Sequence, residues 1–291
     1  MIYLKSQKLL IGVDELASRL RDDKLRIIDC RFDLMDPSAG RDSYLAGHIP
    51  GAVYADLDAD LAAPVDASTG RHPLPEIGAA AETFRRLGVS RETNVVVYDS
   101  AGGAMAARAW WMLQWLGHEE VRLLDGGLPR WQATNRPLEN GEVDVEPGKL
   151  EPTPHGKFVV TTEEVAAELE SGGDLLLVDA RDAARFRGEV EPIDSVAGHI
   201  PGTRNLPFTE ALNQDGTFRA EKELEGLWQG ILGDSKDVDW SAMCGSGVTA
   251  CHLAISALLA GYREPGLYVG SWSEWIRNPD RPVAPGAAPD T

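Results

Sequence analysis

The sequence predicts an α/β protein made of two similar domains, each built on a mainly parallel sheet flanked by helices. The prediction rests on a sequence pattern that occurs twice and on short apolar runs that alternate with helical patterns in both halves. Strands that alternate with helices are typical of parallel sheets, because each helix returns the chain to the edge where the next strand begins. A length of 291 residues suits two domains of roughly 150 residues each.

The repeated pattern is clearest at the pentapeptide GHIPG, which begins at Gly47 and again at Gly198, an offset of 198 − 47 = 151 residues. Two further pairs of segments follow the same order: IIDCR at 27–31 with LVDAR at 177–181, and LLDGGLPRW at 123–131 with LYVGSWSEW at 267–275. Matches in one order with similar spacing indicate an internal duplication.

The segment between the two copies, residues 138–157, is rich in proline, glycine and glutamate and lacks apolar periodicity. This composition is typical of an interdomain linker. We therefore expect a first domain at 1–140, a linker at 141–157 and a second domain at 158–291.

Individual elements can be placed within both copies. Apolar runs at 26–29, 95–98, 121–124 and 175–179 predict strands. Thr161 and Glu164 form a TxxE capping box, which predicts that a helix begins there and continues to about Leu169.

Composition and charge exclude several classes of function. The chain has 46 acidic and 28 basic residues, a formal net charge of −18, so its surface should repel nucleic-acid backbones and anionic membranes. No secretion-type leader or apolar run near 20 residues is evident, so we expect a cytoplasmic protein. The cysteines Cys30, Cys244 and Cys251 are an odd number, which favours reduced thiols, and no metal-ligand spacing occurs.

Features that both copies share are expected to serve the fold, whereas features of one copy are candidates for chemistry. The shared features are His48 with His199, the pair Asp29 and Arg31 with the pair Asp179 and Arg181, and Trp131 with Trp275. We expect structural histidines, acid–arginine ion pairs at strand ends, and tryptophans in the core.

The most informative difference is at Cys244, which aligns with Asp99 of the first copy. Residues 245–250, GSGVTA, lie between a strand end and a helix predicted to run to about Leu259, so backbone N–H groups can surround the sulfur. A helix N-terminus favours the reactive thiolate, and the same donors suit a persulfide anion. A small packed cysteine is the alternative for Cys244 and the preferred interpretation of Cys30 and Cys251.

These motifs resemble those of the tandem-rhodanese sulfurtransferases over nearly the whole chain. GHIPG occurs in many rhodanese-type domains, and CGSGVTA from Cys244 is similar to the mercaptopyruvate branch, whereas the thiosulfate branch typically has basic residues in this loop. The resemblance implies a catalytically silent first domain and a Cys244 persulfide that carries sulfur from 3-mercaptopyruvate to cyanide or a thiol acceptor, such as a thioredoxin-like protein. It implies no cofactor.

The resemblance also assigns further site residues. Arg185 corresponds to the substrate arginine of the family and has Met35 as its counterpart in the first copy. Gly245, Gly247, Val248 and Thr249 complete the substrate-binding loop.

A proton relay is implied for two further residues. They are Ser246 and Asp56, and Asp56 faces Pro207 in the duplicate. A turn-stabilising role is the alternative for both residues, and His72 is a lesser candidate. Ile193 stands where relatives often carry a second substrate arginine, so either anion binding is weaker or another residue substitutes.

Other functions compete with this prediction. GSGVTA matches a GxGxxA dinucleotide fingerprint, but it follows a poor strand near the end of the chain. A cysteine phosphatase needs an arginine six residues after its cysteine, where this chain has Ala250. Thiosulfate sulfurtransferase activity and a non-enzymatic interaction module remain as alternatives.

Overall fold

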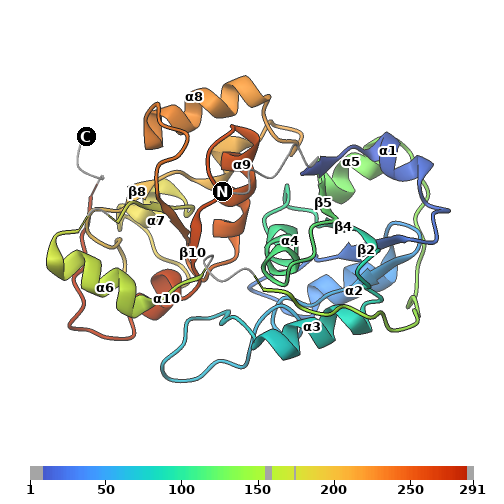
Figure 1. Cartoon of the computed structure of the whole chain (residues 1–291), viewed down its shortest axis with the longest axis horizontal. Coiled ribbons are helices and arrows are strands. Elements are labelled where there is room, and N and C mark those ends of the chain that lie inside the picture. The colour runs from blue at the N-terminus through green and yellow to red at the C-terminus, as the bar shows by residue number, and fades with distance from the viewer. Residues whose placement is uncertain (1–8, 155–158, 174, 287–291) are drawn as a thin grey trace. The chain divides into compact units, whose positions relative to one another are not determined.

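The computed structural model describes residues 9–154, 159–173 and 175–286, which form two compact units (Figure 1). Among these residues, unit 1 comprises 9–60, 77–154 and 214–217, and unit 2 comprises 61–76, 159–213 and 218–286, without residue 174. The predicted division into 1–140, 141–157 and 158–291 stays a prediction, and its residues 155–157 lie outside the described ranges. Segment 61–76 comes from the first half of the sequence but packs within unit 2.

Unit 1 is built on a parallel sheet. Within the described residues its five strands follow the order β1-β5-β4-β2-β3. The strands are β1 (Leu10–Ile11), β2 (Leu25–Asp29), β3 (Ala52–Tyr54), β4 (Asn94–Tyr98) and β5 (Val121–Leu124). The predictions for 26–29, 95–98 and 121–124 are thus confirmed.

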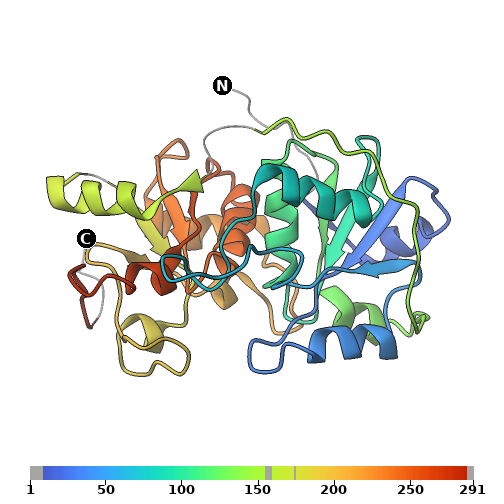
Figure 2. The same cartoon turned by 90° about the horizontal axis from the view of Figure 1, so that it is seen from below.

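Helices cover both faces of this sheet. They are α1 (Val13–Ser18), α2 (Ala39–Ala46), α3 (Ile77–Arg86), α4 (Ala106–Trp115) and α5 (Gly127–Ala133). Figure 2 shows α2 and α5 on one side of the sheet and α3 on the other. On the side of α1 and α5, buried apolar residues such as Leu16, Val96 and Trp131 form a continuous core.

Unit 2 repeats the same parallel topology, with the order β6-β10-β9-β7-β8 among its described residues. The strands are β6 (Val159–Val160), β7 (Leu177–Asp179), β8 (Arg204–Asn205), β9 (Ser241–Met243) and β10 (Gly266–Tyr268). The strand predicted at 175–179 is present as β7, which begins two residues later than expected. The segment expected to be a poor strand forms β9, which lies centrally and pairs with neighbours on both sides.

The helices of unit 2 also lie in two layers. They are α6 (Thr162–Ser171), α7 (Ala183–Phe186), α8 (Glu221–Leu232), α9 (Thr249–Leu259) and α10 (Ser271–Trp275), with a 3₁₀ turn at Phe208–Ala211. The predicted capping box of α6 is present, because Thr161 and Glu164 exchange hydrogen bonds. Figure 1 shows α6 beside α10 and α8 beside α9.

The residues common to both copies serve the fold, as expected. His48 and His199 are buried, bond a backbone carbonyl through Nδ1 and stack on Tyr44 and Phe186. Arg31 and Arg181 pair with Asp29 and Asp179, the last residues of β2 and β7, at 2.6 and 2.8 Å. Trp131 and Trp275 are fully buried, and each donates its indole N–H to a proline carbonyl.

No helix among the described residues is long and apolar enough to cross a membrane.

Candidate active site

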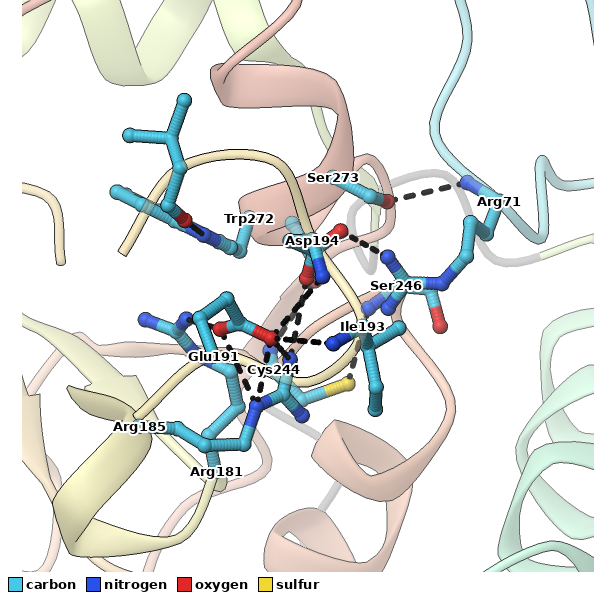
Figure 3. A network of polar contacts seen from close by, with 12 residues as sticks. Arg71, Arg181, Arg185, Glu191, Ile193, Asp194, Cys244, Ser246, Trp272 and Ser273 are labelled. Carbon is cyan, nitrogen blue, oxygen red and sulfur yellow. Dashed lines mark hydrogen bonds and ion pairs between the residues drawn. The ribbon is translucent and has the colours of Figure 1, made fainter. Parts of the chain in front are cut away.

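Cys244 stands directly after β9, at the carboxyl edge of the unit 2 sheet, where parallel α/β sheets bind their ligands. The loop that begins there leads into α9. The N–H of Ser246 points at Sγ of Cys244 over 3.4 Å (Figure 3). Cys244 is 2% exposed. The predicted strand, loop and helix arrangement around this thiol is therefore confirmed.

The start of α10 holds the cysteine loop in place through its backbone. The N–H of Cys244 donates to Oγ of Ser271 over 3.1 Å. Its carbonyl accepts from the N–H of Trp272 at 3.0 Å, and the carbonyl of Gly245 accepts from the N–H of Ser273 at 2.9 Å. Loop residues are usually mobile, but these bonds fix the position of Cys244 through the backbone.

Glycine is required at one position of the loop, and at a second it leaves room for a neighbouring arginine. Gly247 has φ +75°, and a Cβ there would lie 2.5 Å from the carbonyl oxygen of Val269. A Cβ on Gly245 would lie 2.8 Å from a terminal nitrogen of Arg71. Next along the chain, Val248 is buried at the N-cap of α9 and Thr249 begins the helix. The structure thus brings all the predicted loop residues together around Cys244.

Ser246 is buried and has a specific partner. Its Oγ lies 2.7 Å from Nδ1 of His72, which is itself 4% exposed. His72 belongs to segment 61–76, so the hydrogen bond lies within unit 2. A histidine that was a lesser candidate from the sequence is therefore in direct contact with a loop residue of the nucleophile.

Arg185, on the short helix α7, lies beside the loop in a network of ion pairs (Figure 3). It donates to Glu191 at 2.8 Å and to Asp194 at 3.1 Å, and its side chain is 15% exposed. Its terminal nitrogens lie 3.8 and 3.9 Å from the position of a Cβ on Gly245. Arg185 thus lies beside the cysteine loop and is at the same time held by ion pairs to two carboxylates.

The two carboxylates of this network differ in acidity. Burial opposes the charge of Glu191, but hydrogen bonds from Arg185 and two backbone amides outweigh it and hold its pKa below the usual value. Burial raises the pKa of Asp194 above its usual value despite the attraction of Arg71, and the charge of Glu191 adds to the rise.

Arg71 is a site residue that sequence reasoning missed. It comes from segment 61–76 and forms an ion pair with Asp194 (Figure 3). Among residues 61–76, only His72 was a candidate from the sequence. The feature of the sequence that could have indicated Arg71 is the pair Arg71 and His72, which stands between a glycine and a proline.

The corresponding loop of unit 1 holds an anion of its own. Asp99 follows β4 as Cys244 follows β9, and its carboxylate is 1% exposed. Four backbone N–H groups donate to it over 2.7–2.9 Å: those of Ala101, Gly103, Met105 and Ala106. The duplicated loop therefore directs its amides at a negative charge.

Two further positions singled out from the sequence have backbone and side-chain contacts of their own. Asp56 is in unit 1, where its carboxylate accepts from the N–H groups of Asp58 and Ala59 at 2.9 Å, so its catalytic role stays a prediction. Ile193 is 38% exposed, and its backbone N–H donates to Glu191.

Comparisons with known proteins agree with this architecture. The model of the rhodanese-like domain matches residues 12–134 and 161–278. A Pseudomonas aeruginosa protein named probable 3-mercaptopyruvate sulfurtransferase is 47% identical, over 95% of this chain and 98% of that protein. A Mycobacterium tuberculosis protein provisionally named thiosulfate sulfurtransferase SseB is 39% identical, over 97% of this chain and 98% of its own length.

A solved structure is similar over the same extent. The crystal structure of SseA from Escherichia coli, described as a 3-mercaptopyruvate sulfotransferase, has a TM-score of 0.77 and 35% identity, and covers 92% of this chain and 100% of that one. The duplicated parallel sheets, the cysteine loop and these likenesses lead to one assignment. The chain belongs to the rhodanese family, as a member with two rhodanese-like domains in tandem.

Proposed function

We propose that this protein is a sulfurtransferase that takes sulfur from 3-mercaptopyruvate onto Cys244 and passes it as a persulfide to cyanide or a thiol. The observation that carries the proposal is the pair of duplicated loops. Four amides surround the Asp99 carboxylate in one copy, and the N–H of Ser246 points at Sγ of Cys244 in the other. Amides fixed in such a loop stabilise a thiolate or a persulfide anion without reorganising.

The first half-reaction breaks one bond and forms one. The thiolate of Cys244 attacks the sulfur of mercaptopyruvate, the carbon–sulfur bond breaks, and its electron pair remains on the carbon as the enolate of pyruvate. A proton then converts the enolate to pyruvate, and the enzyme keeps a cysteine persulfide. We assign proton delivery to Ser246 with His72, because their hydrogen bond of 2.7 Å lies next to the nucleophile.

The second half-reaction restores the enzyme. A thiolate acceptor attacks the outer sulfur of the persulfide and leaves with it, while the electron pair of the S–S bond returns to Cys244. Cyanide would leave as thiocyanate by the same displacement. We propose a thioredoxin-like protein as the thiol acceptor. We also propose the cytoplasm as the compartment, since the three cysteines are free thiols, as is usual in a reducing compartment. The acceptor is tested by measuring sulfide release in the presence of a thioredoxin system. The compartment is tested by fractionation of cells.

Arg185 supports mercaptopyruvate as the donor. A guanidinium can hold a carboxylate in bidentate fashion, and this one lies beside Gly245, the residue that follows the nucleophile. Thiosulfate leaves as sulfite, which carries up to two negative charges, and residues 245–250 themselves supply no lysine or arginine to balance them. The loop is therefore better suited to a donor that releases a carbon leaving group.

The test compares mercaptopyruvate and thiosulfate under identical conditions, with cyanide as the acceptor. We expect the larger kcat/KM for mercaptopyruvate. A larger value for thiosulfate would assign the protein to the other donor while keeping Cys244 as the nucleophile. Failure to turn over either donor would contradict the enzyme assignment and favour a non-enzymatic interaction module.

A further inference from the structure

A second guanidinium lies beside the nucleophile, and neither the cysteine loop nor α7 supplies it. Nη2 of Arg71 is 2.8 Å from the position of a Cβ on Gly245, closer than either terminal nitrogen of Arg185. Both arginines bind Asp194, Arg71 through Oδ1 and Arg185 through Oδ2 (Figure 3). The two positive charges therefore converge on the backbone next to Cys244.

The backbone of segment 61–76 fixes the position of Arg71. The N–H of Arg71 donates to Oγ of Ser273 over 3.0 Å, and the N–H of Gly70 donates to Glu274 over 3.1 Å. Arg277 holds the segment from the other direction, through a hydrogen bond from Nε to the carbonyl of Thr69 at 3.0 Å. Because Ser273 also clamps the cysteine loop, the guanidinium and the nucleophile have a common support.

Arg71 has donors that the protein does not use. Its Nε is buried and has no hydrogen-bond acceptor among the described residues, although its side chain is 23% exposed overall. Arg185 differs, because its Nε and Nη2 already donate to Glu191. A buried N–H without an acceptor costs free energy unless a ligand binds it, so the free donor indicates a place for an anionic oxygen.

The charges around the loop limit what that anion is. Arg71 and Arg185 are balanced by Glu191 and Asp194, whose side chains are each 4% exposed. A neutral set of four charges accepts one additional negative charge more easily than two. A 2-oxo acid such as mercaptopyruvate carries a single carboxylate, whereas thiosulfate is a dianion.

We infer that Arg71 is a second substrate-binding residue, which holds the donor carboxylate together with Arg185 and compensates for the uncharged Ile193. Asp194 acts as a positioning residue for both guanidinium groups. The inference deepens the proposed function and rests on it for the identity of the donor. The binding of a small carboxylate by Arg71 is independent of the proposed function and is measured separately.

The experiment measures two constants. The first is the dissociation constant of pyruvate from Cys244→Ser protein, which cannot turn over. The second is the KM for mercaptopyruvate in the enzyme with its cysteine intact. Arg71→Ala should raise both constants by about 10- to 100-fold, as should Arg185→Ala, with a smaller change in kcat. Arg187→Ala is the matched control, since that arginine pairs with Glu189 at the surface, and it should change neither constant.

A rescue variant separates substrate binding from a general structural role. Adding Ile193→Arg to Arg71→Ala should recover most of the pyruvate affinity, because it returns a guanidinium to the exposed position next to Asp194. The inference is wrong if folded Arg71→Ala protein binds pyruvate as tightly as its parent. It is also wrong if the loss lies wholly in kcat. Pyruvate binding distinguishes these results from a failure of the proposed function, which would show as absent turnover in the parent enzyme.

Discussion

Asp99 and Cys244 occupy the same position in the two copies of one loop, and the carboxylate of Asp99 accepts four backbone hydrogen bonds there. A carboxylate oxygen is three bonds from Cα, as is the outer sulfur of a cysteine persulfide. The loop of unit 1 thus holds permanently an anion of the size that the loop of unit 2 is proposed to hold in turnover. The comparison is also consistent with the prediction that unit 1 is catalytically silent, since a carboxylate cannot take up sulfur.

Removing this carboxylate should destabilise unit 1. Asp99→Ala leaves the amides of four residues without their acceptor in a partly buried loop, so we expect a loss of about 3 kcal/mol in unfolding free energy. Amide hydrogen exchange should accelerate at residues 101, 103, 105 and 106. The exposed neighbour Ser100→Ala is the control and should change stability by less than about 0.5 kcal/mol. A loss below about 1 kcal/mol for Asp99→Ala would show that water replaces the carboxylate.

The cysteines should differ in their ability to accept sulfur. Intact mass spectrometry after donor treatment should find one added sulfur atom, which dithiothreitol or cyanide removes. Cys244→Ser should abolish the addition. Cys251→Ala and Cys30→Ala should retain it, because Cys251 is packed in α9 and bonds the carbonyl of Gly247. Burial, followed by the charge of Asp29, raises the pKa of Cys30 and suppresses its thiolate. An added sulfur atom on Cys244→Ser protein would show that another residue accepts the sulfur.

Much of the fold was predictable because the duplication supplied an internal comparison. The strands β2, β4 and β5 consist mainly of buried apolar residues, as expected for parallel sheets covered on both faces. The strand β9 was harder to identify, because it is only three residues long and is stabilised by pairing with β7 and β10 rather than by its own composition.

The site was predictable to the extent that it is local in sequence. Cys244 and Ser246 lie in one motif, and Arg185 stands at a fixed distance from Asp179 of the repeat. Arg71 and His72 are different, because their role depends on how segment 61–76 packs on α10. That contact spans about 200 residues of sequence, and neither periodicity nor the duplication encodes it.

Glu264 should make the stability of the protein depend on pH. Burial raises the pKa of Glu264 to about 7, from the usual glutamate value of about 4.5. The folded state therefore binds the proton more tightly than the unfolded chain. The stabilising contribution is complete below about pH 4.5 and is lost as the pH rises to about 7. At about 1.4 kcal/mol per pKa unit, the loss is at most about 3.5 kcal/mol.

The measurement is urea unfolding at pH 5 and pH 8. Relative to the wild type, Glu264→Gln should gain stability at pH 8 and gain little at pH 5, because glutamine does not titrate. The exposed Glu221→Gln serves as the control and should behave like the wild type at both values. An equal difference between Glu264→Gln and the wild type at pH 5 and pH 8 would contradict the assignment.

Ser246 and His72 should act in catalysis as one unit. Their hydrogen bond of 2.7 Å joins the loop of the nucleophile to segment 61–76, and both residues are at least nine-tenths buried. If the pair delivers the proton that the pyruvate enolate needs, either Ser246→Ala or His72→Ala interrupts the same path. Each change should lower kcat for mercaptopyruvate by about 10- to 100-fold, and the double variant should fall no more than about threefold further.

The double-mutant cycle distinguishes a shared path from two separate roles. Independent contributions would multiply, so that the double variant would lose about as much as the product of the two single losses. The pH profile of kcat adds a second readout, since a relay through His72 should remove one titration from the profile in both single variants. Ser195→Ala, an exposed serine on the loop after Asp194, should alter neither quantity. Multiplicative losses with an unchanged profile would leave Ser246 as a residue that only shapes the loop, and the proton would then have to come from elsewhere in the site.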